Sequence, residues 1–486
     1  MGAFKGFMSR TSKVRDKKTG ELFVEHTYGF LWRRFENWSF LGLAYACLYW
    51  ARYNLTVFKN AVSDKIMSPP QFGNIFAVGA WVYGLSFLVV GPLVDRVGGR
   101  RGMLIGLGGT IAVNLIMGVD LYVVQNWGWP IPLYESFIVL YAMNMFFQAF
   151  GAVAIVKVNL PWFHCRERGG FSFIFGALIS LGLFLAFDWG EAVVQATRAV
   201  QRGELKTMAK VFQSLFGLGG SGTDQNWWVF FAPACGLLVL FALNYLIVRN
   251  CPSEAGHHDF NTGSGSLTTD DSAKEGTLAT VKKILTHPVL RWVCAIEFCS
   301  GVLRNGIMHW FPQHAKAIPA FRDNFLNVTN WGLAQFICGV AGAWFAGWFS
   351  DKFFQSRRAP MAAIMYGAMV LALAAMSVFI AGDPVALSIS VLVISTAVIG
   401  VHGVFSGTIT ADFAGTKNVG LTVGVVDGLV YLGTGMQSFA LGHITPAGAL
   451  KANPLNWQWW PLFLLPFALL GTFMALKIWN ARPPPP

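Results

Sequence analysis

Two arginines stand inside stretches that are otherwise apolar enough for the interior of a lipid bilayer. Arg52 lies in "LYWARYNLTVF" (48–58), and Arg304 lies in "SGVLRNGIMHWF" (300–311). A charge at the bilayer centre costs at least roughly 2.5–3.5 kcal/mol, so it is first interpreted as functional. A guanidinium keeps its proton when desolvated, and its planar fork matches two phosphate oxygens. The pair therefore predicts a site for a small anion.

Lys157, Glu297 and Asp427 are further ionisable residues within apolar stretches. A structural ion pair between an arginine and one of the two acids is the alternative to the anion site. Each acid is otherwise interpreted as a partner for an arginine in the empty protein or as a proton carrier. Lys157 is interpreted as a salt-bridge partner or as a side chain that reaches back to the interface.

Two tyrosines precede Arg52 on the same helical face. Tyr45 and Tyr49 lie seven and three residues before it, a spacing that places side chains together on a helix. Their hydroxyls suit hydrogen bonding to phosphate or sugar oxygens, and aromatic packing is the alternative.

The composition indicates a membrane protein. Of the 486 residues, 54% are hydrophobic and 12% are charged, about half the charge of a soluble domain. The seven cysteines are scattered without a CxxC pair, so neither a disulfide framework nor a zinc site is indicated. No nucleophile–base arrangement, phosphate-binding loop or metal cluster is recognisable, so we expect neither an enzyme nor a cofactor. No cleaved signal peptide is recognisable.

Twelve apolar stretches have the length of about 20 residues that a membrane-spanning helix needs. Helices are expected because lipid offers open strands no hydrogen-bond partners, so the predicted fold is all-α. The expected spans are 38–58, 72–93, 102–124, 132–158, 170–189, 227–248, 290–312, 330–350, 360–381, 384–410, 420–443 and 457–479.

Landmarks repeat between the two halves of the chain. Arg52 and Arg304 each lie 14 residues into their span, about 21 Å along a helix. "GPLVDRVGGRRGM" (91–103) closes the second span, and "GWFSDKFFQSRRAPM" (347–361) closes the eighth. We therefore expect two pseudo-symmetric six-helix bundles, the architecture of the major facilitator superfamily. The expected divisions are a basic N-terminal segment (1–37), the bundles (38–248 and 290–479), a linker (249–289) and a tail (480–486).

The distribution of lysine and arginine predicts the orientation. With the N-terminus inside, most of them fall in cytoplasmic segments, so both termini are expected in the cytoplasm. The net charge of +12 is spread over short loops, which argues against a nucleic-acid partner. One long outer segment, 190–226, has helical spacing over 191–217 and is expected to form an amphipathic helix on the outer surface.

Several pieces resemble the organophosphate:phosphate antiporter family, which includes glycerol-3-phosphate and hexose-phosphate transporters. They are "YACLYWARYNL" (45–55), "YGLSFLVVGPLVDR" (83–96), "RERGG" (166–170), "VRNCPSEAG" (248–256), "VLRNGIMHWFP" (302–312), "GWFSDKFF" (347–354) and "GLVYLG" (428–433). In that family one arginine on helix one and one on helix seven hold the substrate phosphate, which implies this role for Arg52 and Arg304.

The resemblance also implies roles for other residues. Tyr83, Tyr431 and Gln148 match positions that line the family's cavity, and His309 replaces an aspartate of helix seven. Phe87 and Ile179 stand where glycerol-phosphate transporters carry a lysine and a histidine, so the pocket is less cationic and a bulkier phosphoester or another anion is at least as well accommodated. The loop motifs imply gating ion pairs, with simple membrane anchoring as the alternative, at Asp95, Arg96, Arg100, Arg101, Asp351, Lys352, Arg357 and Arg358.

The expected function is exchange of an organic phosphate for inorganic phosphate by alternating access. Proton-coupled uptake of an organic anion is a second hypothesis, and a transporter-like phosphoester receptor is a third. We expect a monomer in a bacterial inner membrane, with small phosphorylated anions, inorganic phosphate and lipid as its partners.

Overall fold

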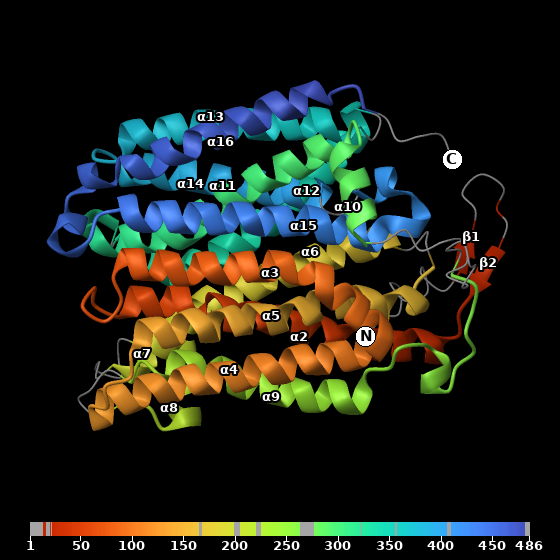
Figure 1. The fold of residues 1–486 in the computed structure, drawn as a ribbon, viewed down its shortest axis with the longest axis horizontal. Coiled ribbons are helices and arrows are strands. Elements are labelled where there is room, and N and C mark those ends of the chain that lie inside the picture. The colour runs from red at the N-terminus through yellow and green to blue at the C-terminus, as the bar shows by residue number, and fades with distance from the viewer. Residues whose placement is uncertain are drawn as a thin grey trace.

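The computed structural model describes residues 13–15, 20, 22–164, 168–198, 205–219, 225–262, 277–321, 323–354, 357–405 and 410–481. Long helices dominate this part of the chain and run roughly side by side, as Figure 1 shows. The predicted all-α membrane fold is confirmed, and each of the twelve predicted spans falls on a long helix. These helices are α2 (Tyr28–Ala61), α3 (Pro69–Val97), α4 (Gly99–Trp127), α5 (Leu133–Asn159), α6 (Arg168–Phe184), α9 (Trp228–Ile247), α11 (Leu290–Ala317), α12 (Trp331–Phe354), α13 (Arg358–Phe379), α14 (Pro384–His402), α15 (Thr410–Ile444) and α16 (Trp459–Lys477).

Three of the long helices are less apolar than the rest. Within the described residues, nine helical segments are long and apolar enough to cross a membrane, and α2, α11 and α15 are not among them. These three have 34, 28 and 35 residues, so length is not the reason. They carry Arg52, Arg304 and Asp427 together with many glycines and polar residues. Such helices are expected to line a polar interior, away from lipid.

The first helix begins ten residues before the predicted span. The Thr27 side chain accepts a hydrogen bond from the Phe30 N–H, which caps the helix. A small separate core then holds the added turns, because Phe30 and Leu31 pack with Trp162 and Phe163. Hydropathy alone did not predict this extension, since it is stabilised by contacts to a distant segment.

Short elements mark the two ends of the molecule. One end, which we call the α10 end, carries an antiparallel hairpin and a short helix. The hairpin consists of β1 (Lys13–Arg15) and β2 (Leu22–Glu25), and the helix is α10 (Thr277–Thr286). The opposite end, which we call the α8 end, carries α7 (Gly190–Thr197) and α8 (Thr207–Phe216), as Figure 1 shows. The single outer helix predicted over 191–217 is therefore two helices, and α7 continues α6 through the π-helical turn η3 (Leu185–Trp189).

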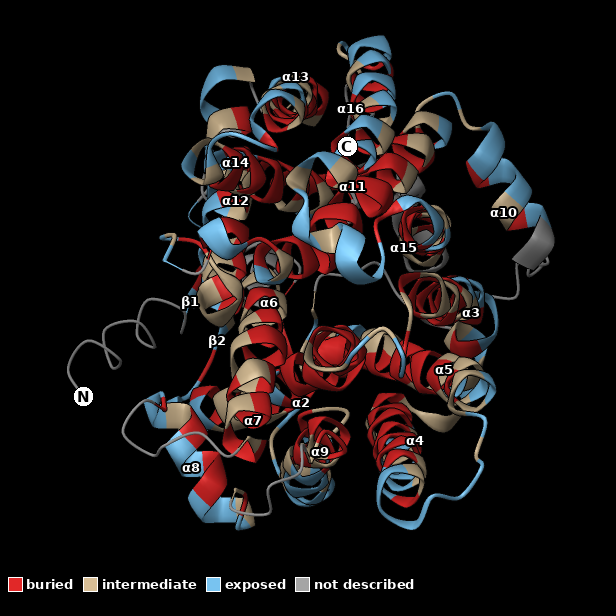
Figure 2. Ribbon diagram, turned by 90° about the vertical axis from the view of Figure 1, so that its left-hand side faces the viewer, coloured by how far each residue is buried: buried red, intermediate tan, exposed pale blue. Residues whose placement is uncertain are grey.

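Two pairs of helices join the earlier and later parts of the chain. We call α2 to α9 the first set and α11 to α16 the second set. Figure 2 shows α3 beside α15 and α6 beside α12. At the first crossing, a Cβ on Gly84 would lie 2.7 Å from the carbonyl oxygen of Gly428, so only glycine permits this approach. At the second, a Cβ on Gly339 would lie 2.1 Å from Ser180 Oγ.

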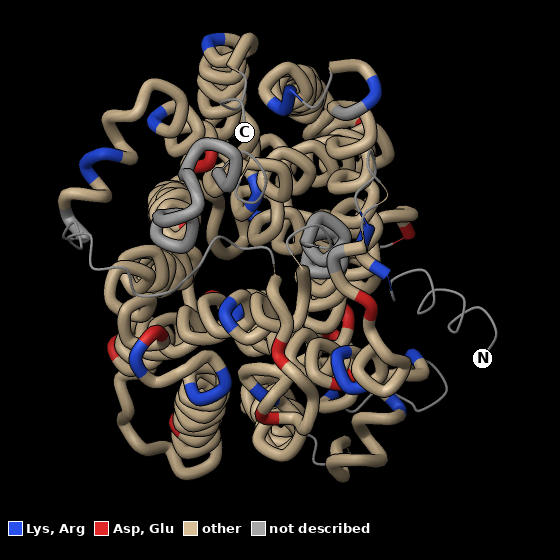
Figure 3. Tube along the Cα trace, turned by 90° about the vertical axis from the view of Figure 1, so that its right-hand side faces the viewer, with Lys and Arg blue, Asp and Glu red and all other residues tan. Residues whose placement is uncertain are grey.

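Charged positions are spread over many helices. Figure 3, seen from the α10 end, shows Lys and Arg positions around the rim on separate elements and no single dense patch among the described residues.

Candidate functional site

Arg52 lies at the centre of the molecule and is 1% exposed. Its Nε donates to Gln148 Oε1 at 2.8 Å, and its Nη1 donates to Tyr431 Oη at 2.5 Å. The guanidinium also lies 4.6 Å from the ring centre of Tyr49 and 4.4 Å from that of Tyr83. Three elements of the first set and one of the second therefore meet at this cation.

Arg304 reaches the same place from the second set. Its guanidinium carbon lies 5.9 Å from the ring centre of Tyr431, and that of Arg52 lies 5.6 Å from the same ring. Arg304 is 8% exposed. Among the described residues, Arg304 Nε and Arg52 Nη2 are buried without a hydrogen-bond partner. A buried donor without a partner is costly, so two such donors on neighbouring cations indicate a place for an anion.

A chain of amides holds Arg52 in position. Gln148 donates to Asn144 Oδ1, Asn114 donates to the same oxygen, and Asn54 donates to Asn114 Oδ1 at 2.7 Å. Asn144 in turn donates to the carbonyl of Ala51 at 3.0 Å, one residue from the arginine. These side chains come from α5, α4 and α2, so the bonds fix both the Gln148 oxygen and the local backbone.

The predicted tyrosines surround the arginines. Tyr45 and Tyr49 have ring centres 5.5 Å apart in an edge-to-face contact, and Tyr83 and Tyr431 have ring centres 4.2 Å apart across the α3–α15 crossing. All four are nearly fully buried. Aromatic faces attract a guanidinium, so the rings support the cations as well as excluding lipid.

His309 faces a different group of residues. Its Nδ1 lies 2.8 Å from Thr56 Oγ1, and its ring centre lies 3.9 Å from that of Phe76. Thr56 lies four residues after Arg52, about one turn along α2 on the α8 side. The bond from Tyr53 Oη to Asn305 Oδ1 (3.3 Å) lies in the same part of these two helices. His309 therefore joins α2 to α11 and does not contact the arginines directly.

The structure corrects the expected pairing of the intramembrane acids. Among the described residues Glu297 pairs with His402 of α14, at 2.7 Å from Oε2 to Nδ1, and not with Arg304. Asp427 forms no described ion pair, and its Oδ1 is buried without a partner among the described residues. The arginines are therefore not neutralised by these acids through direct contact.

Residues 41–438 match the Major Facilitator Superfamily. The chain belongs to this superfamily. It is 21% identical over 465 residues to the glycerol-3-phosphate transporter of Bacillus subtilis, covering 92% of this chain and 93% of that protein. It is 23% identical to the membrane sensor protein UhpC of Escherichia coli, covering 91% of each. The phosphoglycerate transporter protein of Salmonella typhimurium is 24% identical and covers 70% of this chain.

Solved superfamily structures share the fold. A bacterial homologue of the human lysosomal transporter Spinster, in an inward-facing and unoccupied conformation, aligns with a TM-score of 0.64 at 14% identity over 93% of this chain. The D-xylose–proton symporter aligns with a TM-score of 0.62 at 15% identity over 92% of this chain. The prediction of a multi-pass membrane transporter fold, and not an enzyme, is confirmed by the superfamily match.

The superfamily loop motif at the α10 end contains one described ion pair. Lys157 Nζ donates to Asp95 Oδ1 at 2.5 Å and to the carbonyl of Val94 at 3.2 Å, which ties α5 to α3 within the first set. Arg100 donates to the carbonyl of Tyr245, whereas Arg96 and Arg101 are exposed. The motif is thus joined to neighbours in its own set.

The matching motif of the second set has no described ion pair. Lys352 lies 4.9 Å from the ring centre of Trp348. Arg357 donates to the carbonyl of Phe354, and Arg358 donates to that of Gly347. The side chain of Asp351 lies outside the described residues. Among the described side chains of the two motifs, Lys157 with Asp95 is the inter-helix ion pair seen, and it lies within the first set.

The hydrogen bonds described between the two sets lie at the level of the arginines or closer to the α8 end. Figure 1 places this end opposite the hairpin and α10. At the level of the arginines, Arg52 donates to Tyr431 and Trp81 donates to the carbonyl of Leu432. The bonds closer to the α8 end are Tyr53 to Asn305, Thr56 to His309, Lys316 to the carbonyl of Asn60, the N–H groups of Gly332 and Leu333 to Asp188, Lys206 to the carbonyl of Thr329, and Lys451 and the Gly448 N–H to Asp64.

The outermost of these contacts is centred on Asp64. We call Asp64, Lys59, Lys451 and Gly448 the Asp64 cluster. Its Oδ1 accepts from Lys59 Nζ and from Lys451 Nζ, each at 2.6 Å, and its Oδ2 accepts from the Gly448 N–H at 2.7 Å. Partial burial would raise the pKa of this carboxyl, but the bonds from Lys451, Lys59 and Gly448 outweigh it and lower the pKa of Asp64 to about 2. The cluster joins the α2–α3 turn to the α15–α16 connection.

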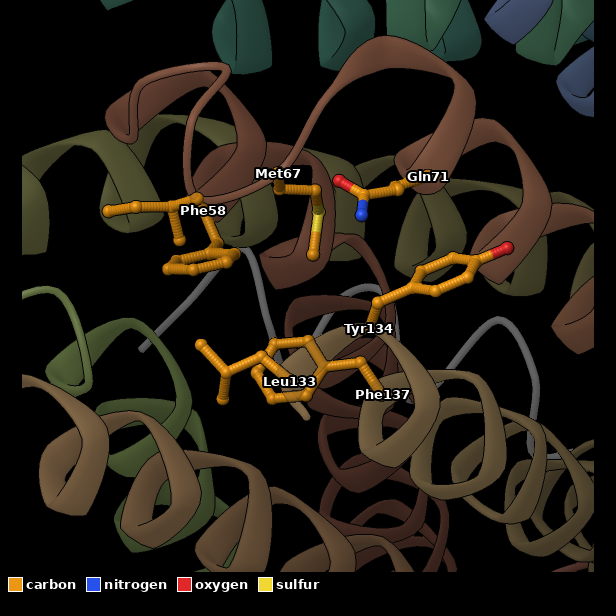
Figure 4. Close-up of a pocket in the computed structure, with 7 residues that line it drawn as sticks. Phe58, Met67, Gln71, Leu133, Tyr134 and Phe137 are labelled. Carbon is orange, nitrogen blue, oxygen red and sulfur yellow. The ribbon is translucent and has the colours of Figure 1, made fainter. Parts of the chain in front are cut away.

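A small recess near the same end is a poor candidate for an anion site. Figure 4 shows that apolar side chains form most of its wall. Gln71 is engaged with Ser68 in a helix cap, and the Tyr134 hydroxyl accepts from Asn74 at 3.0 Å. The recess has no charged residue in its lining, which consists of Phe58, Ile66, Met67, Gln71, Leu133, Tyr134 and Phe137.

Several residues of this arrangement were not predicted. His402 stands at the end of an apolar span, Asp64 in a turn, and Asp188 inside a span. Asp188, like Glu297, is a carboxylate in an apolar stretch, so the same criterion could have identified it. His402 and Asp64 have partners 105 and 387 residues away, and no local pattern indicates such pairs.

Proposed function

We propose that this protein is a secondary transporter that exchanges an organic phosphate for inorganic phosphate. One observation carries the proposal: two buried guanidiniums, one from each set of helices, flank Tyr431, and each has a nitrogen without a described partner. Two fixed cations suit a phosphate dianion. The similarity to transporters named for glycerol-3-phosphate and phosphoglycerate supports a phosphoester as the substrate class.

The same geometry supports obligatory exchange. In the empty protein the two cations repel each other and oppose dehydration of the space between them. A bound phosphate neutralises both, so it stabilises the state in which the two sets close around it. A ligand shifts such an equilibrium only by binding the states unequally, and here it favours the closed state. The loaded carrier therefore crosses more readily than the empty one.

Alternating access follows from where the two sets are joined. The bonds between them gather toward the α8 end, so we assign this conformation as closed at that end. The distribution of Lys and Arg supports a cytoplasmic α10 end and cytoplasmic termini. In this assignment the Asp64 cluster must break for the outer side to open, and the Asp95 motif acts on the opposite side. The two six-helix bundles, 38–248 and 290–479, are the moving bodies.

The remaining proposed site residues act in support. Gln148 and Tyr431 hold Arg52 by hydrogen bonds, and Tyr49 and Tyr83 face its guanidinium. Tyr45 extends this aromatic wall. His309 joins α2 to α11 on the closed side. We propose a monomer as the working unit, since both arginines come from one chain.

Counterflow in vesicles tests this function. Purified protein is placed in vesicles loaded with inorganic phosphate, and uptake of radiolabelled phosphate or glycerol-3-phosphate is followed. We expect uptake that depends on internal phosphate and persists when no pH gradient is present. Vesicles loaded with sulfate or chloride are the controls. Uptake that is unchanged by removing internal phosphate would contradict exchange.

A membrane sensor is the second candidate function. The similarity to the membrane sensor protein UhpC covers 91% of this chain, against 92% for the glycerol-3-phosphate transporter of Bacillus subtilis. A sensor would bind phosphate or a phosphoester yet give no counterflow. Binding by purified protein together with absent counterflow would therefore favour this second function.

A further inference from the structure

Glu297, His402 and Asp427 of the second set interact with one another, and Asp427 lies one turn before Tyr431, the ring that Arg304 contacts. Glu297 is fully buried, with its Oε2 2.7 Å from His402 Nδ1, and the imidazole is 17% exposed. Glu297 Oε1 and Asp427 Oδ1 are both buried without a hydrogen-bond partner among the described residues. An ionised carboxylate oxygen without a partner is costly in a low-dielectric interior, and a proton bound there removes this cost.

The charged neighbours of Asp427 come from two packed elements. It interacts electrostatically with Glu297 and Arg304 of α11 and with His402 of α14. From α3, the titratable residue nearest to this part of α15 is Tyr83, which packs on Tyr431.

The other elements add no described charge to the group around Asp427. Tyr366 of α13 and the thiols of Cys294 and Cys299 interact with Glu297. On α10, which also packs on α15, Lys282 and Lys283 are exposed. Arg304 is therefore the cation that faces Asp427 and also faces the proposed anion.

Charge balance then decides what happens when an anion arrives. Arg52 and Arg304 supply two positive charges. The Glu297–His402 pair is neutral when it shares one proton, on either the imidazole or the carboxyl group. Asp427 supplies one negative charge, so the empty centre carries a net charge of one. A phosphate dianion carries two negative charges and engages Arg304, which removes the cation that stabilised the Asp427 carboxylate.

We propose that phosphate dianion binding is coupled to protonation of Asp427, with the Glu297–His402 pair beside it. The inference rests on the proposed function, because it takes the dianion to lie between Arg52 and Arg304. One proton is taken from water, the carboxylate becomes a carboxylic acid, and no other bond is made or broken. Two guanidiniums then balance the dianion. The carried unit is a phosphate dianion together with one proton.

Proton release and uptake on binding provide the test. Purified protein in a weakly buffered detergent solution with a pH indicator is mixed with inorganic phosphate, at a pH well above the second pKa of phosphate. We expect about one proton taken up per bound phosphate for the wild type. Asp427→Asn should bind phosphate with little or no proton uptake. Asp120→Asn is the matched control, because Asp120 bonds to Ser136 within the first set, and it should behave as wild type.

The outcomes separate this inference from the proposed function. Phosphate binding by wild type without proton uptake, or equal uptake by Asp427→Asn, overturns the inference alone. Absence of phosphate binding by wild type overturns both. If Asp427→Asn does not fold, the pH dependence of phosphate affinity in the wild type is the test. With one linked proton, the affinity falls about tenfold for each unit by which the pH rises in this range. A phosphate affinity that does not change with pH overturns the inference.

Discussion

The two arginines are held differently, although both are buried. Arg52 makes two side-chain hydrogen bonds and faces three tyrosine rings, and a chain of amides fixes its main acceptor. Arg304 has one ring contact described, to Tyr431. Tyr431 is therefore the residue shared by both cations. At this scale the site is one tyrosine with a fixed cation on one side and a less constrained cation on the other.

Replacing either arginine by lysine should nearly abolish phosphate counterflow. A lysine keeps the charge but lacks the planar fork, and a lost charge-assisted hydrogen bond costs about 1.5–3 kcal/mol, or at least about tenfold in affinity. Arg52→Lys and Arg304→Lys are measured in phosphate-loaded vesicles, with thermal unfolding to check that each variant is folded. Arg291→Lys, at the exposed start of α11, is the control. Near-normal counterflow by either site variant would refute the phosphate-binding assignment.

Tyr431→Phe should weaken phosphate binding by a few fold. The change removes the hydroxyl that accepts from Arg52 at 2.5 Å, so that nitrogen loses its partner while the ring stays. Tyr366→Phe is the matched control, since Tyr366 is also fully buried and its hydroxyl donates to the carbonyl of Ile296 at 2.7 Å. That control should lower stability but leave phosphate affinity within about twofold. Equal losses of affinity in both variants would assign Tyr431 a purely structural role.

At the scale of elements, α3 and α15 form the closest crossing between the two sets. Gly84 and Gly428 face each other there, with a built Cβ on either residue 2.7–3.0 Å from the carbonyl oxygen of the other. The crossing lies beside Tyr83 and Tyr431, so it also sets the distance between the aromatic wall and the arginines. Close helix contact through small residues is common in membranes.

Gly84→Val should lower both stability and transport. Its Cβ would meet the backbone of Gly428, and overpacking of this kind costs about 1–3 kcal/mol. Gly91→Val on the same helix is the matched control, because no atom lies within 4 Å of its built Cβ. We expect a thermal midpoint several degrees lower for Gly84→Val than for Gly91→Val. Indistinguishable midpoints and counterflow rates would mean that the helices separate here without cost.

For the whole molecule, the bonds between the two sets are unevenly distributed along the helices. They gather toward the α8 end, and the Asp64 cluster is the outermost of them. Asp64→Asn should therefore shift the population toward a form open at that end. The measurement is the reactivity of an Asn60→Cys variant toward an impermeant maleimide added from the α8 side. We expect faster labelling with Asp64→Asn and unchanged labelling with Asp120→Asn, and equal rates in both would contradict the role.

The Asp64 cluster should also make closure sensitive to strong acid. The pKa of Asp64 in the closed form is about 2, below the ordinary aspartate value of about 3.9. A lowered pKa means that the carboxylate favours the closed form above that ordinary value and loses this effect as pH falls toward 2. Maleimide labelling itself slows in acid because it needs the thiolate, so the rate is compared with that of Asp64→Asn at each pH. The ratio of the wild-type rate to the Asp64→Asn rate should be constant from pH 8 to about 5 and approach one below about 4. A ratio that does not change with pH would contradict this role of Asp64.

The sequence predicted the helices well because each span is a local feature. Hydropathy located all twelve, and a cation in an apolar stretch located Arg52 and Arg304. The partner of Glu297 was not predicted, because His402 lies 105 residues away and nothing near either residue indicates the contact. Asp64 and Lys451 were missed for the same reason, since turns at the surface carry charges in most proteins. Contacts between distant segments depend on how the helices cross. The spacing of apolar residues along one segment does not predict these crossings.

The amide chain behind Arg52 has a thermodynamic consequence. Because Arg52 is already fixed by Gln148 and Tyr431, it loses little side-chain freedom when an anion arrives. Arg304 has a described contact only with a ring, so ordering its long side chain carries most of the entropic cost, about 0.5–1.5 kcal/mol. Titration calorimetry with phosphate should therefore give an unfavourable entropy that shrinks in Arg304→Ala more than in Arg52→Ala. Gln148→Ala should make the binding entropy more unfavourable. Without the Gln148 acceptor, the Arg52 guanidinium is mobile in the empty protein and is ordered only when the anion binds.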